Sequence, residues 1–119
     1  MKKIVVADDE VKIGQFLKRA LELNGHTVRT AETTEAAWAL IVSDPPDLLI
    51  TDCKLPPSDG IALMRQAHAQ FPDMPVVMIT GFDETETEAQ ARAAGAKGFF
   101  GKPLNVAEVC AKVRELLGV

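Results

Sequence analysis

Hydrophobic residues along this chain switch repeatedly between two patterns. Five short apolar runs occupy residues 4–7, 26–30, 47–52, 75–80 and 97–100. After each run, apolar residues recur at the spacing of a helix buried on one side, at about residues 11–23, 34–42, 60–71, 84–94 and 106–117. Strands in strict alternation with helices predict an α/β fold with a doubly wound five-stranded parallel sheet, whose right-handed crossovers place helices on both faces.

Residues typical of helix starts and helix ends lie where the apolar pattern places the ends of the helices. Asn24 and Gly25 are typical of a helix end, Thr33 or Thr34 is typical of the start of the second helix, and Asn105 is typical of the start of the last.

Two helices differ in their apolar faces. In the first we expect a buried face made of Val11, Phe16, Leu17, Ala20, Leu21 and Leu23. The helix at 84–94 is rich in Glu and Ala and has little apolar surface, so we expect it to be the least firmly packed.

Composition narrows the classes of protein. A length of 119 residues fits one domain spanning residues 1–119, and 47% hydrophobic with 25% charged residues is ordinary for a globular protein. The net charge of -4 argues against direct nucleic-acid binding by this domain. The N-terminus has no apolar stretch long enough for a signal peptide or membrane span, and Cys53 and Cys110 form no CxxC motif. We therefore expect a protein of the cytoplasm that does not bind membranes.

Polar residues follow four of the five predicted strands. The acid pair Asp8-Asp9 follows the first, Asp52 ends the third, Thr80 ends the fourth and Lys102 follows the fifth. The carboxyl ends of parallel strands meet at one edge of the sheet, where ligands bind in such folds, so these side chains should converge. Three carboxylates so close together repel unless a cation joins them or one is protonated, so we expect a hard, oxygen-seeking ion such as Mg²⁺.

The surrounding motifs give a family resemblance. The acid pair, the segment Asp52-x-x-Leu55-Pro56-x-x-x-Gly60, Thr80-Gly81 and Lys102-Pro103 resemble the response-regulator receiver domain of two-component signalling, the CheY-like superfamily, from the first strand to the last helix. The resemblance implies a flavodoxin-like fold with strand order 2-1-3-4-5.

It also implies a metal site and a phosphoacceptor. Asp9 and Asp52 would bind Mg²⁺ (or Mn²⁺) directly, Asp8 largely through water, and Lys54 through its main-chain carbonyl. Asp52 would accept a phosphoryl group, because a carboxylate can attack phosphorus when metal and cationic donors neutralise the phosphoryl oxygens.

Further residues take roles by the same resemblance. Lys102 and the Thr80 hydroxyl would be the non-metal donors to the phosphoryl group. Phe99 matches the aromatic position that turns inward with Thr80 when receivers are phosphorylated, with core packing as the alternative for this ring. Lys54 and Phe82 flank the approach of the hydrolytic water and would set the phosphoryl lifetime.

The implied function is that of a bacterial signalling switch, which catalyses only its own phosphorylation and dephosphorylation. The expected partners are a sensor histidine kinase or phosphotransfer protein and a downstream output domain or protein, with a possible phosphorylation-dependent homodimer. The face formed by the fourth helix, fifth strand and fifth helix would carry the signal. The chain fits either a whole single-domain regulator or a receiver from a longer one.

Two alternatives stay open. Phosphatases of the haloacid dehalogenase type also form an aspartyl phosphate, but they carry a second aspartate two positions after the nucleophile, where this chain has Lys54. A phosphorylation-independent interaction module on the same fold is the other alternative, and the presence of all the site residues counts against it.

Overall fold

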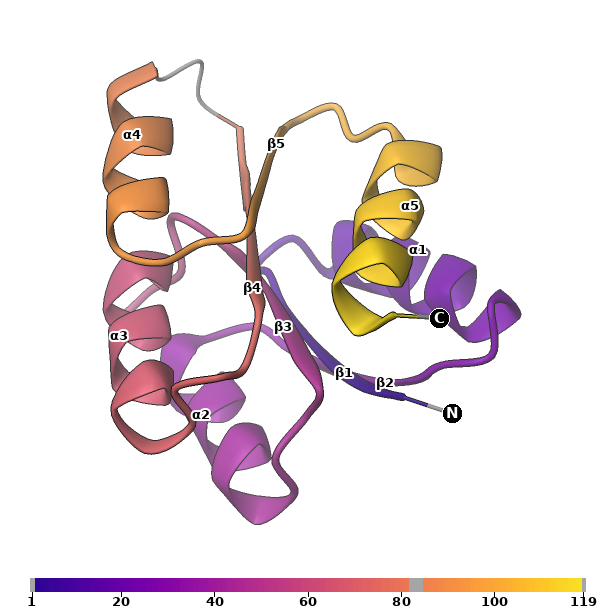
Figure 1. Cartoon of the computed structure of the whole chain (residues 1–119), viewed down its shortest axis with the longest axis horizontal. Helices are drawn as coiled ribbons and strands as arrows, with labels where there is room; N and C mark the ends of the chain where they lie inside the picture. The colour runs from indigo at the N-terminus through magenta and orange to yellow at the C-terminus, as the bar shows by residue number, and fades with distance from the viewer. Residues whose placement is uncertain (1, 82–84, 119) are drawn as a thin grey trace.

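A computed structural model of the chain describes residues 2–81 and 85–118 and has the predicted alternation of strands and helices (Figure 1). The strands are β1 (Lys3–Ala7), β2 (Thr27–Ala31), β3 (Leu48–Asp52), β4 (Val76–Thr80) and β5 (Gly98–Gly101). The helices are α1 (Val11–Leu23), α2 (Thr34–Ser43), α3 (Gly60–Gln70), α4 (Thr85–Ala93) and α5 (Val106–Leu117). All neighbouring strands are parallel, and their order is β2-β1-β3-β4-β5. The predicted fold class and strand order are confirmed.

The helices form two layers around the sheet. One face packs against α1 and α5, through residues such as Leu17, Leu21 and Val109, while α2, α3 and α4 cover the other (Figure 1). Alternate residues of each strand point to opposite faces, so the central strands β3 and β4 are buried at every position. Both faces of the sheet therefore hold a hydrophobic core, and the carboxyl ends of the strands are left for polar groups.

Capping residues fix the helix starts close to the predicted ones. Thr33, and not Thr34, caps α2 by accepting a hydrogen bond from Ala36 N. Asp59 caps α3, and Asn105 caps α5 as predicted. Among the described residues, no helix is long and apolar enough to cross a membrane.

The predicted apolar face of α1 is only partly correct. Leu17 and Leu21 are fully buried, but Phe16 is 58% and Leu23 83% exposed. At 3.6 residues per turn, Phe16 and Leu23 point about 100–160° around the helix axis away from Leu17 and Leu21, so they lie outside the buried stripe. Val11 is also largely exposed, at the first position of the helix.

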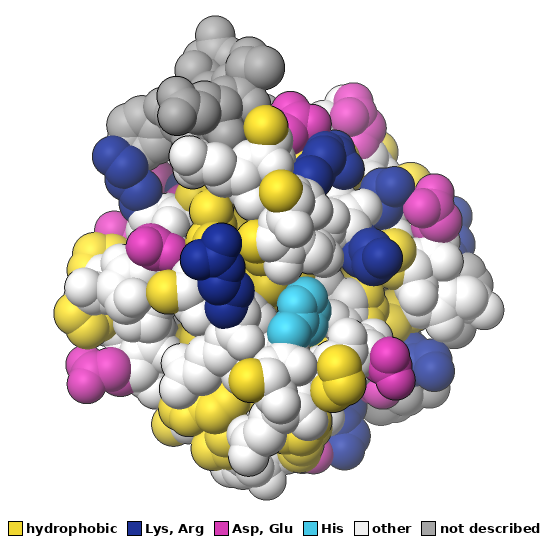
Figure 2. Space-filling view, turned by 60° about the vertical axis from the view of Figure 1, so that its left-hand side comes forward, with side chains coloured by type: hydrophobic (Ala, Val, Ile, Leu, Met, Phe, Trp, Pro, Cys, Tyr) yellow, Lys and Arg dark blue, Asp and Glu magenta, His cyan; other side chains and the backbone are white. Residues whose placement is uncertain are grey.

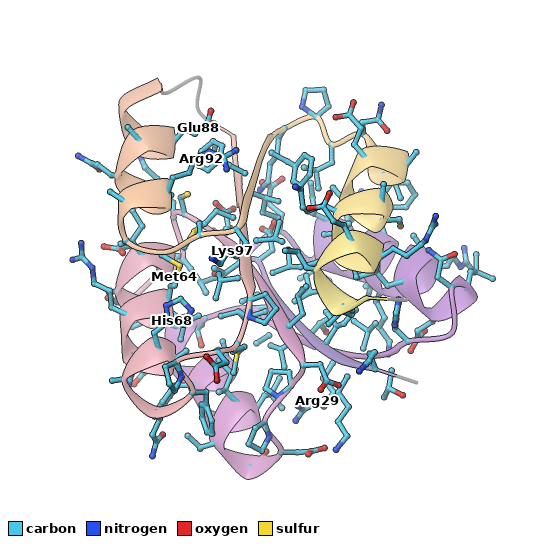
Figure 3. The ribbon with its side chains drawn as sticks, viewed as in Figure 1. Arg29, Met64, His68, Glu88, Arg92 and Lys97 are labelled. Carbon is cyan, nitrogen blue, oxygen red and sulfur yellow. The ribbon has the colours of Figure 1, made fainter. Side chains whose placement is uncertain are left out.

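The described side chains of helix α4, at residues 88–93, bury little apolar surface. Between residues 88 and 93, Ala91 is the one buried side chain. Glu88 and Arg92 form an exposed ion pair along α4, and both lie above Met64 and His68 of the neighbouring α3 (Figure 3). The face on which α3 and α4 come forward mixes acidic, basic and small apolar areas (Figure 2). Over residues 88–93, this arrangement agrees with the expectation of a weakly packed α4.

Candidate functional site

The register of the sheet places the predicted polar residues at one edge. Ala7 pairs with Thr51, so Asp8 comes to lie beside Asp52 at the ends of adjacent strands. On the other side of β3, the backbone N–H of Lys102 donates to the carbonyl of Thr80 (2.7 Å), which continues the pairing of β4 with β5. Residues far apart in the sequence are thus brought together by backbone hydrogen bonds.

The ammonium of Lys102 lies among three carboxylates. Its Nζ is 2.8 Å from Asp52 Oδ2, 3.1 Å from Asp8 Oδ2 and 2.6 Å from Glu10 Oε1. Burial lowers the pKa of this lysine, but the hydrogen-bonded carboxylates outweigh burial and raise the pKa above its ordinary value. Lys102 is therefore a permanent cation, with all three of its N–H donors directed at acids.

Asp8 is the most deeply buried acid of the site. Its Oδ1 accepts a hydrogen bond from the backbone N–H of Glu10 (2.8 Å). Its buried Oδ2 faces Lys102 Nζ but accepts no well-aligned hydrogen bond from the described residues. Burial raises the pKa of Asp8 to about 6, against the hydrogen bonds from Glu10 and Lys102. The interaction with Lys102 thus offsets only part of the rise in the pKa of Asp8 that burial causes.

Asp52 ends β3 with 4% of its surface exposed. Its Oδ2 accepts from Lys102, and its Oδ1 accepts from the backbone N–H of Lys54 (3.1 Å). Each carboxylate oxygen is therefore oriented by a donor. Lys54 itself has an exposed side chain, at the start of the loop that leads to α3.

The site has the donor set for a hard divalent cation. Carboxylate oxygens of Asp8, Asp9, Glu10 and Asp52 lie within 4.8 Å of one another. The buried Asp8 Oδ2 is 3.1 Å from Lys102 Nζ but accepts no aligned hydrogen bond from the described residues, so a cation or a water bound to it would supply the missing partner. Oxygen-only donors of this kind suit Mg²⁺ or a similar ion.

Thr80 and Phe99 lie on β4 and β5, the strands beyond Asp52, and Thr80 follows directly after Ile79, the residue that pairs with Asp52. Thr80 ends β4 and is 1% exposed. Phe99 pairs with Met78, two residues before Thr80, and packs half-buried against the core beneath α2, α3 and α4. Since every second residue of a strand faces the same side, Thr80 and Phe99 are neighbours on one face. Phe82 lies outside the described residues.

Sequence reasoning missed one member of the site. Glu10 directly follows the acid pair Asp8-Asp9 and has no role in the predicted site, yet it makes the shortest contact with Lys102. The acidic run was the available signal, but it does not indicate that the third side chain reaches a lysine 92 positions away.

A search against protein-family models identifies the matching family. The model described as the response regulator receiver domain matches residues 4–114. Response regulator MprA of Mycobacterium ulcerans (strain Agy99) is 34% identical over 115 residues, which are 97% of this chain and 50% of that protein. MprA of Mycobacterium avium (strain 104) is 33% identical over the same length. The chain spans about half the length of these curated relatives.

Solved structures agree closely with the fold. The receiver domain of the Francisella response regulator 1452 has a TM-score of 0.92 at 30% identity, with 99% of this chain and 98% of that chain covered. The receiver domain of NtrX from Brucella abortus has a TM-score of 0.91 at 36% identity, with 98% of each chain covered. In a structure of NtrX in complex with ADP, this chain matches 27% of the length.

Proposed function

This chain belongs to the response regulator receiver domain family, and on that premise we propose that it is a phosphorylation-dependent signalling switch whose phosphoacceptor is Asp52. One observation carries the assignment. Lys102 Nζ lies 2.8 Å from Asp52 Oδ2 at the edge of the sheet where a cluster of acids could hold a divalent cation. A nucleophilic carboxylate, a fixed cation and oxygen ligands for a metal are the parts that phosphoryl transfer to an aspartate needs.

The transfer balances without further reactants. An oxygen of Asp52 forms a bond to phosphorus while the bond from phosphorus to the donor breaks. With a phosphohistidine donor of a kinase or phosphotransfer protein, the leaving group is the histidine imidazole, which takes up a proton and becomes neutral. With acetyl phosphate, the leaving group is acetate. Lys102 and the Thr80 hydroxyl would donate to the phosphoryl oxygens, which stabilises the charge that develops on them.

The acids of the site would hold Mg²⁺ or Mn²⁺ beside the acceptor. Asp9 and Asp52 would contribute carboxylate oxygens, the main-chain carbonyl of Lys54 would contribute another, and Asp8 would act largely through water. A bound divalent ion supplies positive charge that offsets the repulsion between Asp52 and an anionic phosphodonor. Orienting the carboxylates is the role of this chain's own residues, Lys102 and the backbone N–H groups of Glu10 and Lys54.

The signal would leave through Thr80 and Phe99. When the Thr80 hydroxyl turns toward the phosphoryl group, space opens on the face of the sheet that Phe99 shares, and the half-buried ring can move into it. Between residues 88 and 93 the adjacent α4 buries Ala91 alone, so this part of the helix has little packing to resist such a change. We assign the output surface to α4, β5 and α5, where an output domain, a partner protein or a second copy of the chain would bind.

Phosphorylation by a small donor tests the proposal. Wild-type protein incubated with acetyl phosphate and Mg²⁺ should gain one phosphoryl group by intact mass, and omission of Mg²⁺ should prevent the gain. Asp52→Asn should gain none, because an amide is not a nucleophile toward phosphorus. Asp73→Asn, the same chemical change at an exposed loop position, should behave like wild type. If wild-type protein took no label, the phosphorylation-independent interaction module would be the better assignment.

A further inference from the structure

Glu10 differs from the other acids around Lys102 in being exposed. The Glu10 side chain is 59% exposed, whereas those of Asp8 and Asp52 are 0% and 6% exposed. Even so, Glu10 Oε1 makes the shortest contact with Lys102 Nζ, at 2.6 Å. The lysine is thus held between two buried carboxylates and one that lies at the mouth of the site.

The backbone of Glu10 is fixed while its side chain is available. Its N–H donates to Asp8 Oδ1, and its carbonyl accepts from Ile13 and Gly14 in the first turn of α1. Although Glu10 is the N-cap residue of α1, its side chain makes no capping hydrogen bond. The Glu10 carboxylate therefore contacts Lys102 from a backbone that is held by hydrogen bonds. The side chain can move away without breaking any capping hydrogen bond of α1.

An incoming phosphoryl group needs the space that this carboxylate holds. Phosphorus must approach the attacking Asp52 oxygen to about 3–3.5 Å. Glu10 places a carboxylate oxygen within 4.8 Å of an Asp52 oxygen and on the same ammonium that would bind the phosphoryl oxygens. Two anionic groups in that space repel each other, and Glu10 is the one with room to move.

We propose that the Glu10 carboxylate occupies the phosphoryl-binding position of Lys102 in the unphosphorylated protein and competes with the incoming phosphoryl group for the ammonium. Glu10 is thereby a positioning residue, since it acts on the reaction through Lys102. The inference rests on the proposed function of Asp52 and Lys102. Removing the competition should strengthen phosphodonor binding and leave the chemical step nearly unchanged.

Initial rates of phosphorylation across a range of acetyl phosphate concentrations, with Mg²⁺ saturating for each variant, test the competition. In Glu10→Gln the donor concentration that gives half the maximal rate should fall by about twofold to fivefold, which is what losing an exposed ion pair corresponds to. The maximal rate should stay close to that of wild type. Beryllofluoride with Mg²⁺, a phosphoryl mimic that involves no transfer, should bind the variant more tightly by a similar factor.

Two matched variants separate this mechanism from a general charge effect. Glu22→Gln also removes one carboxylate and one exposed ion pair, between Lys18 and Glu22 on α1, and should behave like wild type. Glu10→Asp keeps the charge on a side chain one methylene shorter, so it should lose the contact with Lys102 and resemble Glu10→Gln.

The outcomes distinguish the two proposals. If wild-type protein is labelled on Asp52 and Glu10→Gln has unchanged or weaker donor binding, the competition is refuted while the proposed function stands. A faster Glu10→Gln beside an unchanged Glu10→Asp would also refute it, because charge alone would then be responsible. If wild-type protein takes no label, both proposals are wrong.

Discussion

The first residue of α3, Gly60, lies so close to the end of β3 that a Cβ atom on it would overlap the carbonyl oxygen of Asp52. The Gly60 N–H donates to the carbonyl of Cys53 (2.8 Å), which holds the helix start against the strand end. Gly60 is not among the glycines with a positive φ angle. Glycine is needed here because only a residue without a Cβ atom lets the two backbone segments approach so closely.

Gly60→Ala should therefore shift the backbone that carries Asp52. We expect a loss of about 1–3 kcal/mol in the free energy of unfolding, as for other overpacked positions. Gly14→Ala is the matched control, because a Cβ there would make only ordinary contact with Thr30 and the change favours helix. The control should be neutral or stabilising by up to about 1 kcal/mol. Denaturant unfolding measures both, and equal stability of the two variants would contradict the close approach.

Much of the fold could be predicted from the sequence because local signals agreed with each other. Apolar runs, helical spacing and caps such as Asn105 all indicated the same alternation, and small shifts occurred only at segment ends. β4, for example, begins at Val76 and not at Pro75, since proline has no N–H to donate to a neighbouring strand. Strand order was not available from these signals and came from the family resemblance.

Two features could not be predicted from the sequence, each for its own reason: which side of α1 is exposed, and the role of Glu10. Helix α1 has apolar residues on more than one side. The sequence pattern alone therefore does not show that Leu17 and Leu21 are buried while Phe16 is exposed. The Glu10 contact with Lys102 depends on side-chain conformation across two strand ends, which no local pattern specifies.

Metal binding should depend most on Asp9. The acid cluster supplies few protein ligands, so Mg²⁺ should bind weakly, and Asp9→Ala should weaken its binding most. Mg²⁺ at 100 times its dissociation constant should stabilise wild-type protein by about 2.7 kcal/mol. Thermal unfolding over a Mg²⁺ titration measures the effect, with Asp73→Ala as control. An Asp9→Ala titration that overlays wild type would remove Asp9 from the ligand set.

Phosphorylation should loosen or reorder α4 more than α3. Helix α3 buries Leu63, Met64 and Ala67, whereas α4 buries Ala91 alone between residues 88 and 93. Less packed elements respond to a local change in charge. Hydrogen exchange with and without beryllofluoride and Mg²⁺ should show changed protection in α4 and little change in α3. The same protection of α4 in both states would argue against this output surface.

The aspartyl phosphate should outlast those of fast-resetting receivers. Hydrolysis needs a water molecule oriented opposite the leaving Asp52 oxygen, and neither Lys54 nor Phe82 supplies an amide or carboxylate to hold it. The double substitution Lys54→Asn and Phe82→Glu should speed loss of the phosphoryl group by about tenfold or more, roughly 1.4 kcal/mol in barrier height. The decay is measured after removal of kinase and phosphodonor. An unchanged rate would mean that both side chains lie away from the attacking water.

Locating the phosphoryl group in wild-type protein tests most directly whether Asp52 is the phosphoacceptor. After reaction with acetyl phosphate and Mg²⁺, borohydride reduces an aspartyl phosphate to homoserine, which marks the modified residue permanently. The tryptic peptide of residues 30–54 contains Asp44 and Asp47 as well as Asp52, so fragmentation by mass spectrometry compares the three directly. We expect homoserine at position 52 alone. Modification at another aspartate, with position 52 intact, would contradict it.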